Sequence, residues 1–314
     1  HTHVVTGVDF SPCGKYVCTG SFDKTVRIWN ALNGEALAIL QGHMQFIHCI
    51  KWMPGGSGIL TGSSDRTLKG WLLLNNGCND MSKFLWGCGT VLEFAFAHCN
   101  AANMEDQHAD SDEFQRLTMK HRAHLPFMSC VMTTLVGHEG SVLACAFSRQ
   151  GSKIASGGSD KTLRIWHAGR AFDKTNAAQA TQAIITGHTK SVVSVAFSFS
   201  EDLVASGSED CTVRVHSANT FETLRIINLA DGYGLSIDFL GGDEHLLVAT
   251  GDKRIKICGV QSGTVRDGAA LPSLHRSIPV ISSFREGSEL IYGAGDYSVG
   301  HLTGVMSCVN GQRE

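Results

Sequence analysis

Two intervals between polar and aromatic residues recur along this chain, and they restrict its fold more than any other feature. In the segment 137–166, His138 precedes Asp160 by 22 residues, and Trp166 follows Asp160 by six. The same intervals separate the members of two further sets, which are His1, Asp23 and Trp29, and His43, Asp65 and Trp71. A pattern that recurs every 40–50 residues or so is typical of propellers and solenoids, so we expect a repeat protein.

Three later copies keep the spacing but change residue types. His188 and Asp210 are followed by His216 in the tryptophan position. The last two copies consist of Ala230, Asp252 and Cys258, and of His275, Asp296 and Leu302, the final one being a residue shorter. Together the copies extend over nearly the whole chain.

Each copy alternates apolar and polar residues between turn-forming residues. In the copy 137–166, Leu163 and Ile165 alternate with polar neighbours, and Gly-Gly-Ser-Asp at 157–160 interrupts the alternation. A period of two predicts β-strands, and Gly, Ser and Asp between them predict hairpin turns. Val142 falls outside the alternation, which predicts a β-bulge in the first strand. We therefore expect an all-β fold.

These repeats resemble the WD-repeat family of β-propellers. The resemblance rests on the Gly-His pairs at 42–43, 137–138 and 187–188, and on the turns SFDKTVRIW, SSDRTLKGW, GSDKTLRIW and SEDCTVRVH. It implies a ring of four-stranded antiparallel sheets, called blades, of about 40–45 residues each. The length of 314 residues fits seven of them, so we expect one seven-bladed propeller domain over 1–314.

The interval between His43 and His138 leaves room for two blades. We expect the second blade to end with a strand within 81–86, followed by a degenerate third blade. Its first strand would contain Val91, Phe94 and Phe96, its last would be 132–136, and 97–126 would form a divergent insert. The chain begins inside the first repeat, and only 305–309 could supply the last blade's fourth strand. The resemblance therefore implies that the strand closing the ring precedes His1.

The recurrent polar residues form sets of four. In the family pattern, the aspartate binds the histidine, the histidine binds a hydroxyl, and the hydroxyl binds the indole N–H. A histidine near an aspartate and a serine also suggests a hydrolase, but catalysis needs one such set, whereas repetition favours a structural role. We therefore expect no catalytic residue. Where His216 or Cys258 replaces the tryptophan, we expect the hydrogen-bonded chain to be shortened or lost and the blade to be looser. The structural sets are His1, Thr19, Asp23 and Trp29; His43, Thr61, Asp65 and Trp71; His138, Ser156, Asp160 and Trp166; and the incomplete His188, Ser206 and Asp210.

Composition excludes several other functions. A net charge of −3 gives no electrostatic case for nucleic-acid binding, and no apolar run reaches the roughly 18 residues of a membrane helix. The histidines and cysteines at 98, 99, 108, 121, 124 and 130 match no common zinc spacing, so we expect no metal, cofactor or small-molecule substrate. Eleven cysteines without a Cys-x-x-Cys pair are typical of free thiols in a reducing compartment, the cytoplasm or nucleus.

In the resembled family, fixed positions after the repeat histidine and before the aspartate line the top face and the channel mouth. Exposed aromatic residues there are typical anchors for a peptide or helix. Adjacency of the aromatics in the first two blades predicts a patch, and the insert 97–126 is a second candidate surface. The partner-binding candidates are Phe22, Phe46, His48, Leu143, Val193, Tyr233, Leu235 and Ile278.

The function expected from the resemblance is a non-enzymatic protein–protein interaction scaffold within a larger assembly, for example a cytoskeletal or ribonucleoprotein assembly. One alternative is a substrate receptor of a cullin-type ubiquitin ligase. Such receptors usually carry Trp-Asp followed by Arg two residues later, whereas this chain has Trp29-Asn30, Trp71-Leu72 and Trp166-His167. The other is an RNA-associated propeller in RNA processing or ribosome biogenesis, although we expect no direct nucleic-acid binding.

Overall fold

The computed structural model describes residues 1–75, 127–173, 176–230, 232–240, 243–252, 254–270, 280–284, 289–293 and 299–303. These residues form five four-stranded sheets and one three-stranded sheet, all antiparallel. The first sheet comprises β1 (Val5–Phe10), β2 (Tyr16–Ser21), β3 (Thr25–Asn30) and β4 (Ala36–Gln41). The second comprises β5 (Ile47–Trp52), β6 (Gly58–Ser63), β7 (Thr67–Asn75) and β8 (Phe127–Val136).

The next two sheets have the same strand order, and the third also carries two short helical turns. The third sheet comprises β9 (Val142–Phe147), β10 (Lys153–Gly158), β11 (Leu163–His167) and β12 (Thr181–Ile185). Between β11 and β12 lie α3 (Ala168–Ala171) and η2 (Ala177–Gln179). The fourth sheet comprises β13 (Val192–Phe197), β14 (Leu203–Ser208), β15 (Thr212–Ser217) and β16 (Thr223–Asn228).

The last two sheets complete the described fold. The fifth comprises β17 (Gly234–Phe239), β18 (His245–Thr250), β19 (Arg254–Gly259) and β20 (Val265–Ala270). The sixth comprises β21 (Val280–Phe284), β22 (Glu289–Gly293) and β23 (Val299–Thr303). The expectation of all-β, four-stranded antiparallel sheets is thus confirmed for five sheets.

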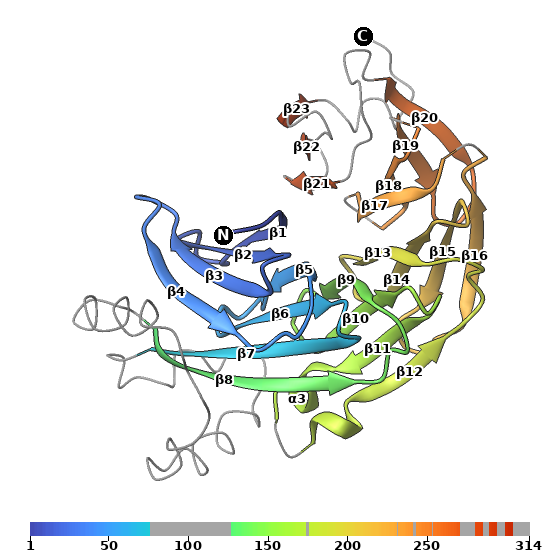
Figure 1. Ribbon diagram of the computed structural model, residues 1–314. Coiled ribbons are helices and arrows are strands. Elements are labelled where there is room, and N and C mark those ends of the chain that lie inside the picture. Colours follow the sequence, from blue (N-terminus) through green and yellow to red (C-terminus); the bar gives the residue numbers. More distant parts are fainter. Residues whose placement is uncertain are drawn as a thin grey trace.

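The sheets follow one another along an arc (Figure 1). The first strands of successive sheets are neighbours, in the order β1, β5, β9, β13, β17 and β21, while the fourth strands lie on the outer side of the arc. This arrangement resembles the blades of a propeller. The seven blades and the closed ring stay predictions.

The prediction that 132–136 form the last strand of a degenerate third blade is wrong. Residues 132–136 belong to β8, which pairs with β7 from Thr67↔Val136 to Asn75↔Phe127 and so completes the second sheet. The outer position expected for 81–86 is therefore taken by β8, and β5 of the second sheet packs directly on β9 of the third. The predicted strand around 91–96 and the insert 97–126 lie outside the described residues, as does 305–309.

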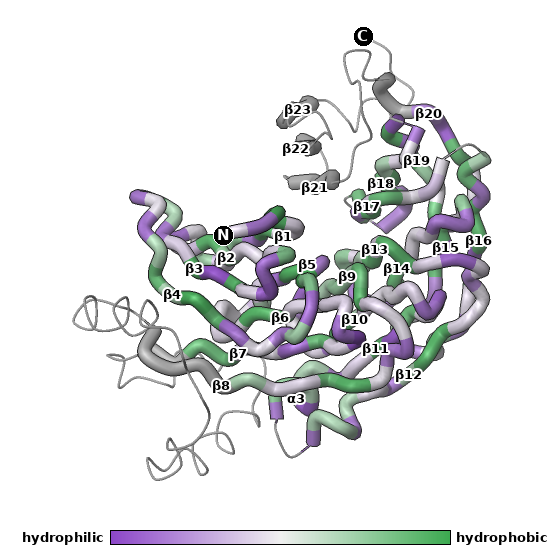
Figure 2. Tube along the Cα trace, viewed as in Figure 1, coloured by the Kyte–Doolittle hydropathy of each residue, from purple (hydrophilic) through white to green (hydrophobic). Residues whose placement is uncertain are grey.

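The core lies between adjacent sheets. Strands of adjacent sheets present apolar side chains to each other, as Ile165 in β11 and Leu246 in β18 do, and both are fully buried. Figure 2 shows hydrophobic residues along the strands and hydrophilic residues at turns such as the one between β3 and β4. Burial of these apolar faces is the main stabilising term for such stacked sheets.

The first sheet has one face that no described sheet covers. Val8 and Phe10 in β1 are 59% and 61% exposed, whereas Ile50 and Trp52, their equivalents in β5, are 3% and 5% exposed. The difference follows from position, because the first sheet covers β5.

A side chain from the link between β11 and β12 packs against the second sheet. Phe172, at the end of α3, is buried against Gly58 and Gly70 of the second sheet, and an added Cβ at Gly70 would lie 2.7 Å from its ring. The equivalents of Gly70 in the first and third sheets are Ile28 and Ile165. The glycine therefore makes room for Phe172, which fills the volume that an isoleucine fills elsewhere.

Candidate functional site

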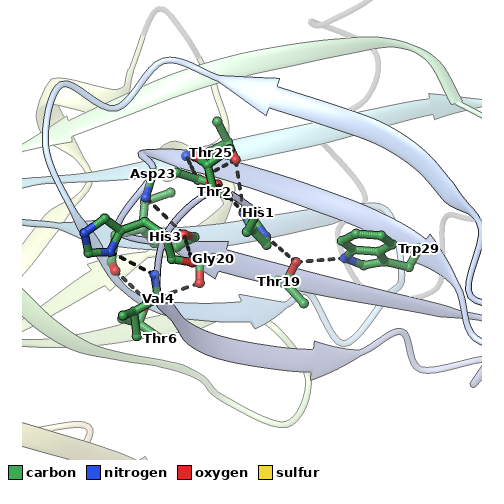
Figure 3. A network of polar contacts seen from close by, with 12 residues as sticks. His1, Thr2, His3, Val4, Thr6, Thr19, Gly20, Asp23, Thr25 and Trp29 are labelled. Carbon is green, nitrogen blue, oxygen red and sulfur yellow. Dashed lines mark hydrogen bonds and ion pairs between the residues drawn. The ribbon is translucent and has the colours of Figure 1, made fainter. Parts of the chain in front are cut away.

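The first sheet contains a continuous chain of four hydrogen-bonded side chains, drawn in Figure 3. Trp29 Nε1–H donates to Thr19 Oγ1 at 2.8 Å, and Thr19 Oγ1 lies 2.7 Å from His1 Nε2. His1 Nδ1 lies 2.7 Å from Asp23 Oδ2. An indole can only donate, so the hydroxyl gives its own hydrogen to His1 Nε2, and His1 Nδ1–H donates to the carboxylate. Each donor in the chain thus finds an acceptor.

The second and third sheets repeat this geometry. In the third, His138 lies 2.8 Å from Asp160 and 2.7 Å from Ser156, and Trp166 donates to Ser156 at 2.8 Å. In the second, His43 lies 2.7 Å from both Asp65 and Thr61. Trp71 donates to Thr61 at 2.9 Å. We call each complete set a tetrad.

The surroundings of the tetrads suit structural groups. Burial opposes the ionisation of Asp65 and Asp160, but hydrogen bonds, first those from His43 and His138, hold the pKa of both carboxyls below the usual range. Burial also lowers the pKa of His43, against the opposing influence of Asp65. The side chains of His43 and His138 have no solvent exposure, so no substrate can reach the imidazoles. Polar groups buried in this way contribute to stability because each has a partner.

The fourth sheet keeps the chain although it lacks the tryptophan. His188 lies 2.9 Å from Asp210 and 3.0 Å from Ser206. His216 Nε2 takes the place of the indole at 3.1 Å from Ser206, and His216 Nδ1 lies 3.1 Å from Thr223 Oγ1. The expectation that the chain is shortened or lost at His216 is therefore wrong, because an imidazole N–H can replace an indole N–H.

The protonation state of His216 follows from its burial. Burial, helped by the nearby His188 and Arg214, lowers the pKa of His216 to about 3. The ring is therefore neutral near pH 7 and can donate through Nε2 while accepting through Nδ1.

The fifth sheet has lost the chain. The positions of histidine, hydroxyl and tryptophan hold Ala230, Val248 and Cys258, of which the last two are fully buried. Asp252 accepts a hydrogen bond from the Thr250 hydroxyl and lies 3.9 Å from the Lys256 ammonium group. Of the last copy, His275 and Asp296 lie outside the described residues.

Three of the cations that lie four residues after a repeat aspartate are not part of a basic surface. Arg164 and Lys256 are buried, and Arg214 is half-buried. Arg214 donates to the Gly187 carbonyl at 2.7 Å, and Lys256 donates to the Leu229 carbonyl. Gly187 and Leu229 both directly precede the histidine position, so these cations anchor the segment that enters the sheet.

One residue in each first strand stands outside the regular pairing. The register shifts by one residue at the same place in the five four-stranded sheets, which confirms the bulge predicted at Val142. A bulge redirects a side chain relative to the sheet. The residues skipped by the pairing are Thr6, His48, Leu143, Val193 and Leu235, of which four were predicted as partner-binding residues.

The structure brings three of the predicted aromatics together on the first two sheets. Phe22 and Phe46 are stacked with ring centroids 4.7 Å apart, and His48 meets Phe22 edge-on at 5.7 Å. The sequence did not identify His3, whose ring centroid lies 5.6 Å from that of Phe22 and 6.1 Å from that of Phe46. We call His3, Phe22, Phe46 and His48 the aromatic patch. The only sequence signal for His3 is that it directly precedes Val4, which occupies one of the recurrent top-face positions, three residues after the repeat histidine.

The other candidates lie apart from the aromatic patch. Tyr233 is exposed on the fifth sheet and packs beside Gly251. Leu143, Val193 and Leu235 are half-buried at the bulges of their sheets. Ile278 lies outside the described residues.

Two searches of the described residues bear on other functions. Within those ranges, no group of three or more His, Cys, Asp or Glu side chains is arranged to hold a metal ion. Of the six zinc candidates, only Cys130, in β8, falls inside them. The same part of the chain contains no helix with the length and apolarity needed to cross a membrane.

The repeats match a known family model. The model WD40, described as WD domain, G-beta repeat, matches residues 1–30, 34–71, 128–167 and 179–217. The chain belongs to the WD40-repeat family. The last three matches each run from the outer strand of one sheet to the third strand of the next, which agrees with β8 as the outer strand of the second sheet.

Curated relatives share parts of this WD40 protein. Mitochondrial division protein 1 of Aspergillus oryzae is 27% identical over 167 residues, which is 53% of this chain and 22% of the relative. The Notchless protein homolog of Arabidopsis thaliana is 43% identical over 44 residues, 14% of this chain and 9% of the relative. The general transcriptional corepressor TUP1 of Saccharomyces cerevisiae is 44% identical over 46 residues, 15% of this chain and 6% of the relative. The matches thus span about a fifth or less of each relative.

Proposed function

We propose that this WD40 protein is a non-enzymatic scaffold that binds other proteins through the aromatic patch within a larger assembly. The observation that carries the proposal is the exposure of an aromatic cluster on a hydrogen-bonded frame. Phe46 is 44% exposed although it stacks on Phe22, and Met44 beside it is 76% exposed. Exposed aromatic side chains held in a fixed arrangement are typical of protein-binding hot spots.

The frame supports this role because each tetrad fixes a turn of the top face, the face formed by the segments that carry the repeat histidines and aspartates. Phe22 directly precedes Asp23, whose carboxylate accepts from His1 and from the backbone N–H of Thr2 and Thr25. Phe46 follows His43 by three residues, and its carbonyl accepts from the Ser64 backbone N–H. Both rings are therefore attached to ordered turns, which reduces the entropy lost on binding.

The other proposed functions receive less support. Asparagine, leucine and histidine follow Trp29, Trp71 and Trp166, which does not fit the pattern of cullin-ligase receptors. An RNA-associated role would place this protein in an assembly through protein contacts, because its net charge is −3. Both roles are therefore alternatives that the sequence supports less than it supports the scaffold.

We also propose a reducing compartment, the cytoplasm or nucleus, as the location. Cys18, Cys145 and Cys258 are buried as free thiols, and burial raises the pKa of Cys258 to about 12. Buried thiols of this kind are common in proteins that function where disulfides do not form.

Affinity purification of the full chain from cells, compared between two variants, tests the scaffold. Phe46→Ala removes an exposed ring of the aromatic patch, and Leu224→Ala removes an exposed apolar side chain from β16 as a matched control. We expect Phe46→Ala to lose a defined set of the proteins that wild type retains, and Leu224→Ala to keep them. Equal recovery of all partners by the two variants would remove the aromatic patch from the proposal.

A further inference from the structure

We infer that the aromatic patch receives an acidic peptide segment with an aromatic or large aliphatic side chain as its anchor, an inference that rests on the proposed function. The first observation is that the top turns of the first two sheets are more apolar than those of the third and fourth sheets. The residues one and three positions after the repeat histidine include Val4, Met44 and Phe46 in the first two sheets, all exposed. In the third and fourth sheets the equivalents are Glu139, Ser141, Thr189 and Ser191.

The rings of the aromatic patch form a surface suited to an apolar side chain. Phe22 and Phe46 are nearly parallel, with 27° between their planes, and His3 is stacked on Phe46 at 28°. Stacked rings restrict one another, so an incoming aromatic or aliphatic side chain finds a surface that needs little ordering. Val4 and Met44 extend this apolar surface on the same turns.

The polar groups that the aromatic patch offers to a ligand are donors. Val4 N–H donates to His3 Nδ1 at 2.8 Å, so neutral His3 carries its proton on Nε2 and presents an N–H. His48 and Ser64 bind each other at 2.6 Å. Lys24 and Arg66 are exposed in the turns that carry Phe22 and Ser64.

The carboxylates of those turns are occupied. Asp23 and Asp65 each accept from a histidine and from the hydroxyl and backbone N–H of the threonine two residues later. Their side chains are only 6% and 9% exposed. The charged groups that remain for a partner on these turns are therefore the cations Lys24 and Arg66, which favour a ligand rich in carboxylates.

The top turns of the third and fourth sheets expose charges of both signs. Their top turns expose Glu139 and Glu209 together with Lys161 and Lys190. Carboxylates there would repel an acidic segment, so charge favours its placement on the first two sheets.

A single-stranded nucleic acid also combines negative charge with rings that stack on aromatics. Two exposed cations are few for such a ligand, and its phosphates would leave Val4 and Met44 without apolar partners. A peptide provides both the carboxylates and the apolar anchor, so the observations favour a peptide.

The test is selection from a random-peptide phage library on the full chain, followed by fluorescence polarisation with one enriched peptide. We expect enriched sequences that place Trp, Phe, Leu or Met beside Asp or Glu. Phe46→Ala should weaken binding about tenfold or more. The double variant Lys24→Glu, Arg66→Glu should weaken it about fivefold and reduce its dependence on salt. Leu224→Ala should bind as wild type does.

Several results would overturn the inference. They are enrichment of basic or uncharged peptides, equal affinity of wild type and Phe46→Ala, or displacement of the peptide by an oligouridylate. Absence of any enriched peptide, with affinity-purified partners still dependent on Phe46, would refute the acidic peptide while the scaffold stands. If the partners do not depend on Phe46 either, both proposals fail. Thermal unfolding of each variant, compared with wild type, verifies that it is folded.

Discussion

The third and fifth sheets share one strand order and one bulge but differ in the groups that hold their top turns. In the third sheet, Asp160 accepts from His138 and from the backbone N–H groups of Glu139 and Thr162. In the fifth, Asp252 is held by the Thr250 hydroxyl and by nearby cations. The same architecture is therefore reached with a buried polar chain in one place and with apolar packing in the other.

This difference shows what the tetrads contribute. In the fifth sheet the histidine, hydroxyl and tryptophan are all replaced, and Val248 and Cys258 pack into an apolar cluster with Phe239 and Leu246. Replacing every partner of a buried polar chain with apolar groups is nearly neutral, whereas removing one partner leaves the others unpaired. The tetrad is thus not required for a sheet to form, but where it is present each member depends on the rest.

The largest effect is expected outside the tetrad, at the link between β11 and β12 of the third sheet. Phe172→Ala would empty the space over Gly70 and Gly58 and should cost about 3–5 kcal/mol in the free energy of unfolding. Urea denaturation of the wild type and the variant measures this change in the free energy of unfolding. In the fifth sheet the corresponding link is a short turn, and Ser262→Ala there is a control that should change stability by less than about 0.5 kcal/mol. A cost below about 1 kcal/mol for Phe172→Ala would show that the link does not fasten the second sheet.

Next in size is the loss of the tetrad carboxylate. Asp160→Ala should cost about 2–4 kcal/mol, because His138 and two backbone N–H groups lose their acceptor. Asp252→Ala is the matched change in the fifth sheet, and since Asp252 is partly exposed it should cost about 1 kcal/mol or less. Comparison of the two by chemical denaturation sharpens the contrast, and equal costs would contradict it.

A third change introduces a polar group where the fifth sheet has none. Val248→Thr nearly preserves volume but places a hydroxyl in an apolar cluster, at the position that holds Ser156 in the third sheet. We expect a cost of about 1–3 kcal/mol for the desolvated hydroxyl. Thermal unfolding would show it, and a neutral result would mean that the fifth sheet can accommodate part of a tetrad.

The smallest expected effect is that of mild acid on the fourth sheet. The pKa values of His188 and His216 lie below their ordinary value near 6.5 because both are buried. The unfolded chain therefore takes up protons that the folded sheet does not, and the stability present above pH 6.5 decreases as the pH falls. Each such histidine contributes up to about 1 kcal/mol between pH 6.5 and 5.5.

Hydrogen exchange at several pH values checks this prediction. The fourth sheet should lose protection before the fifth, which has Ala230 and Cys258 at the two histidine positions. His216→Trp, which restores the residue of the intact tetrads, should reduce the pH dependence. If mild acid reduced protection elsewhere but left that of the fourth sheet unchanged, the role given to its two buried histidines would be contradicted.

Much of the fold could be predicted from local signals. Alternation within 137–166 predicts the strands and the bulge, and the resemblance to the WD-repeat family implies which residues form the tetrads. The blade count could not be predicted in the same way. Residues 132–136 precede a Gly-His pair, which predicts an outer strand. The sequence does not predict that this strand pairs with β7, from which residues 76–126 separate it along the chain.

The candidate site was only partly accessible to sequence reasoning. Phe22, Phe46 and His48 were found because they occupy recurrent positions, whereas His3 lies at a position that the pattern does not mark. The hydrogen-bonded chain retained at His216 could not be predicted because the family pattern has tryptophan there, although an imidazole can also donate. The contact between Phe172 and Gly70 joins residues about a hundred positions apart and depends on volume, and its only signal was glycine in place of isoleucine.

Native-state hydrogen exchange of the unmodified protein tests the central claim most directly, that tetrads fix the top turns on which partners would bind. The amides of Glu139 and Thr162 donate to Asp160 at 2.9 and 3.1 Å. The account predicts that they exchange at least about tenfold more slowly than the amides at equivalent positions around Asp252, and that Asp160→Ala abolishes the difference. Equal exchange in the third and fifth sheets of the wild-type protein would contradict it.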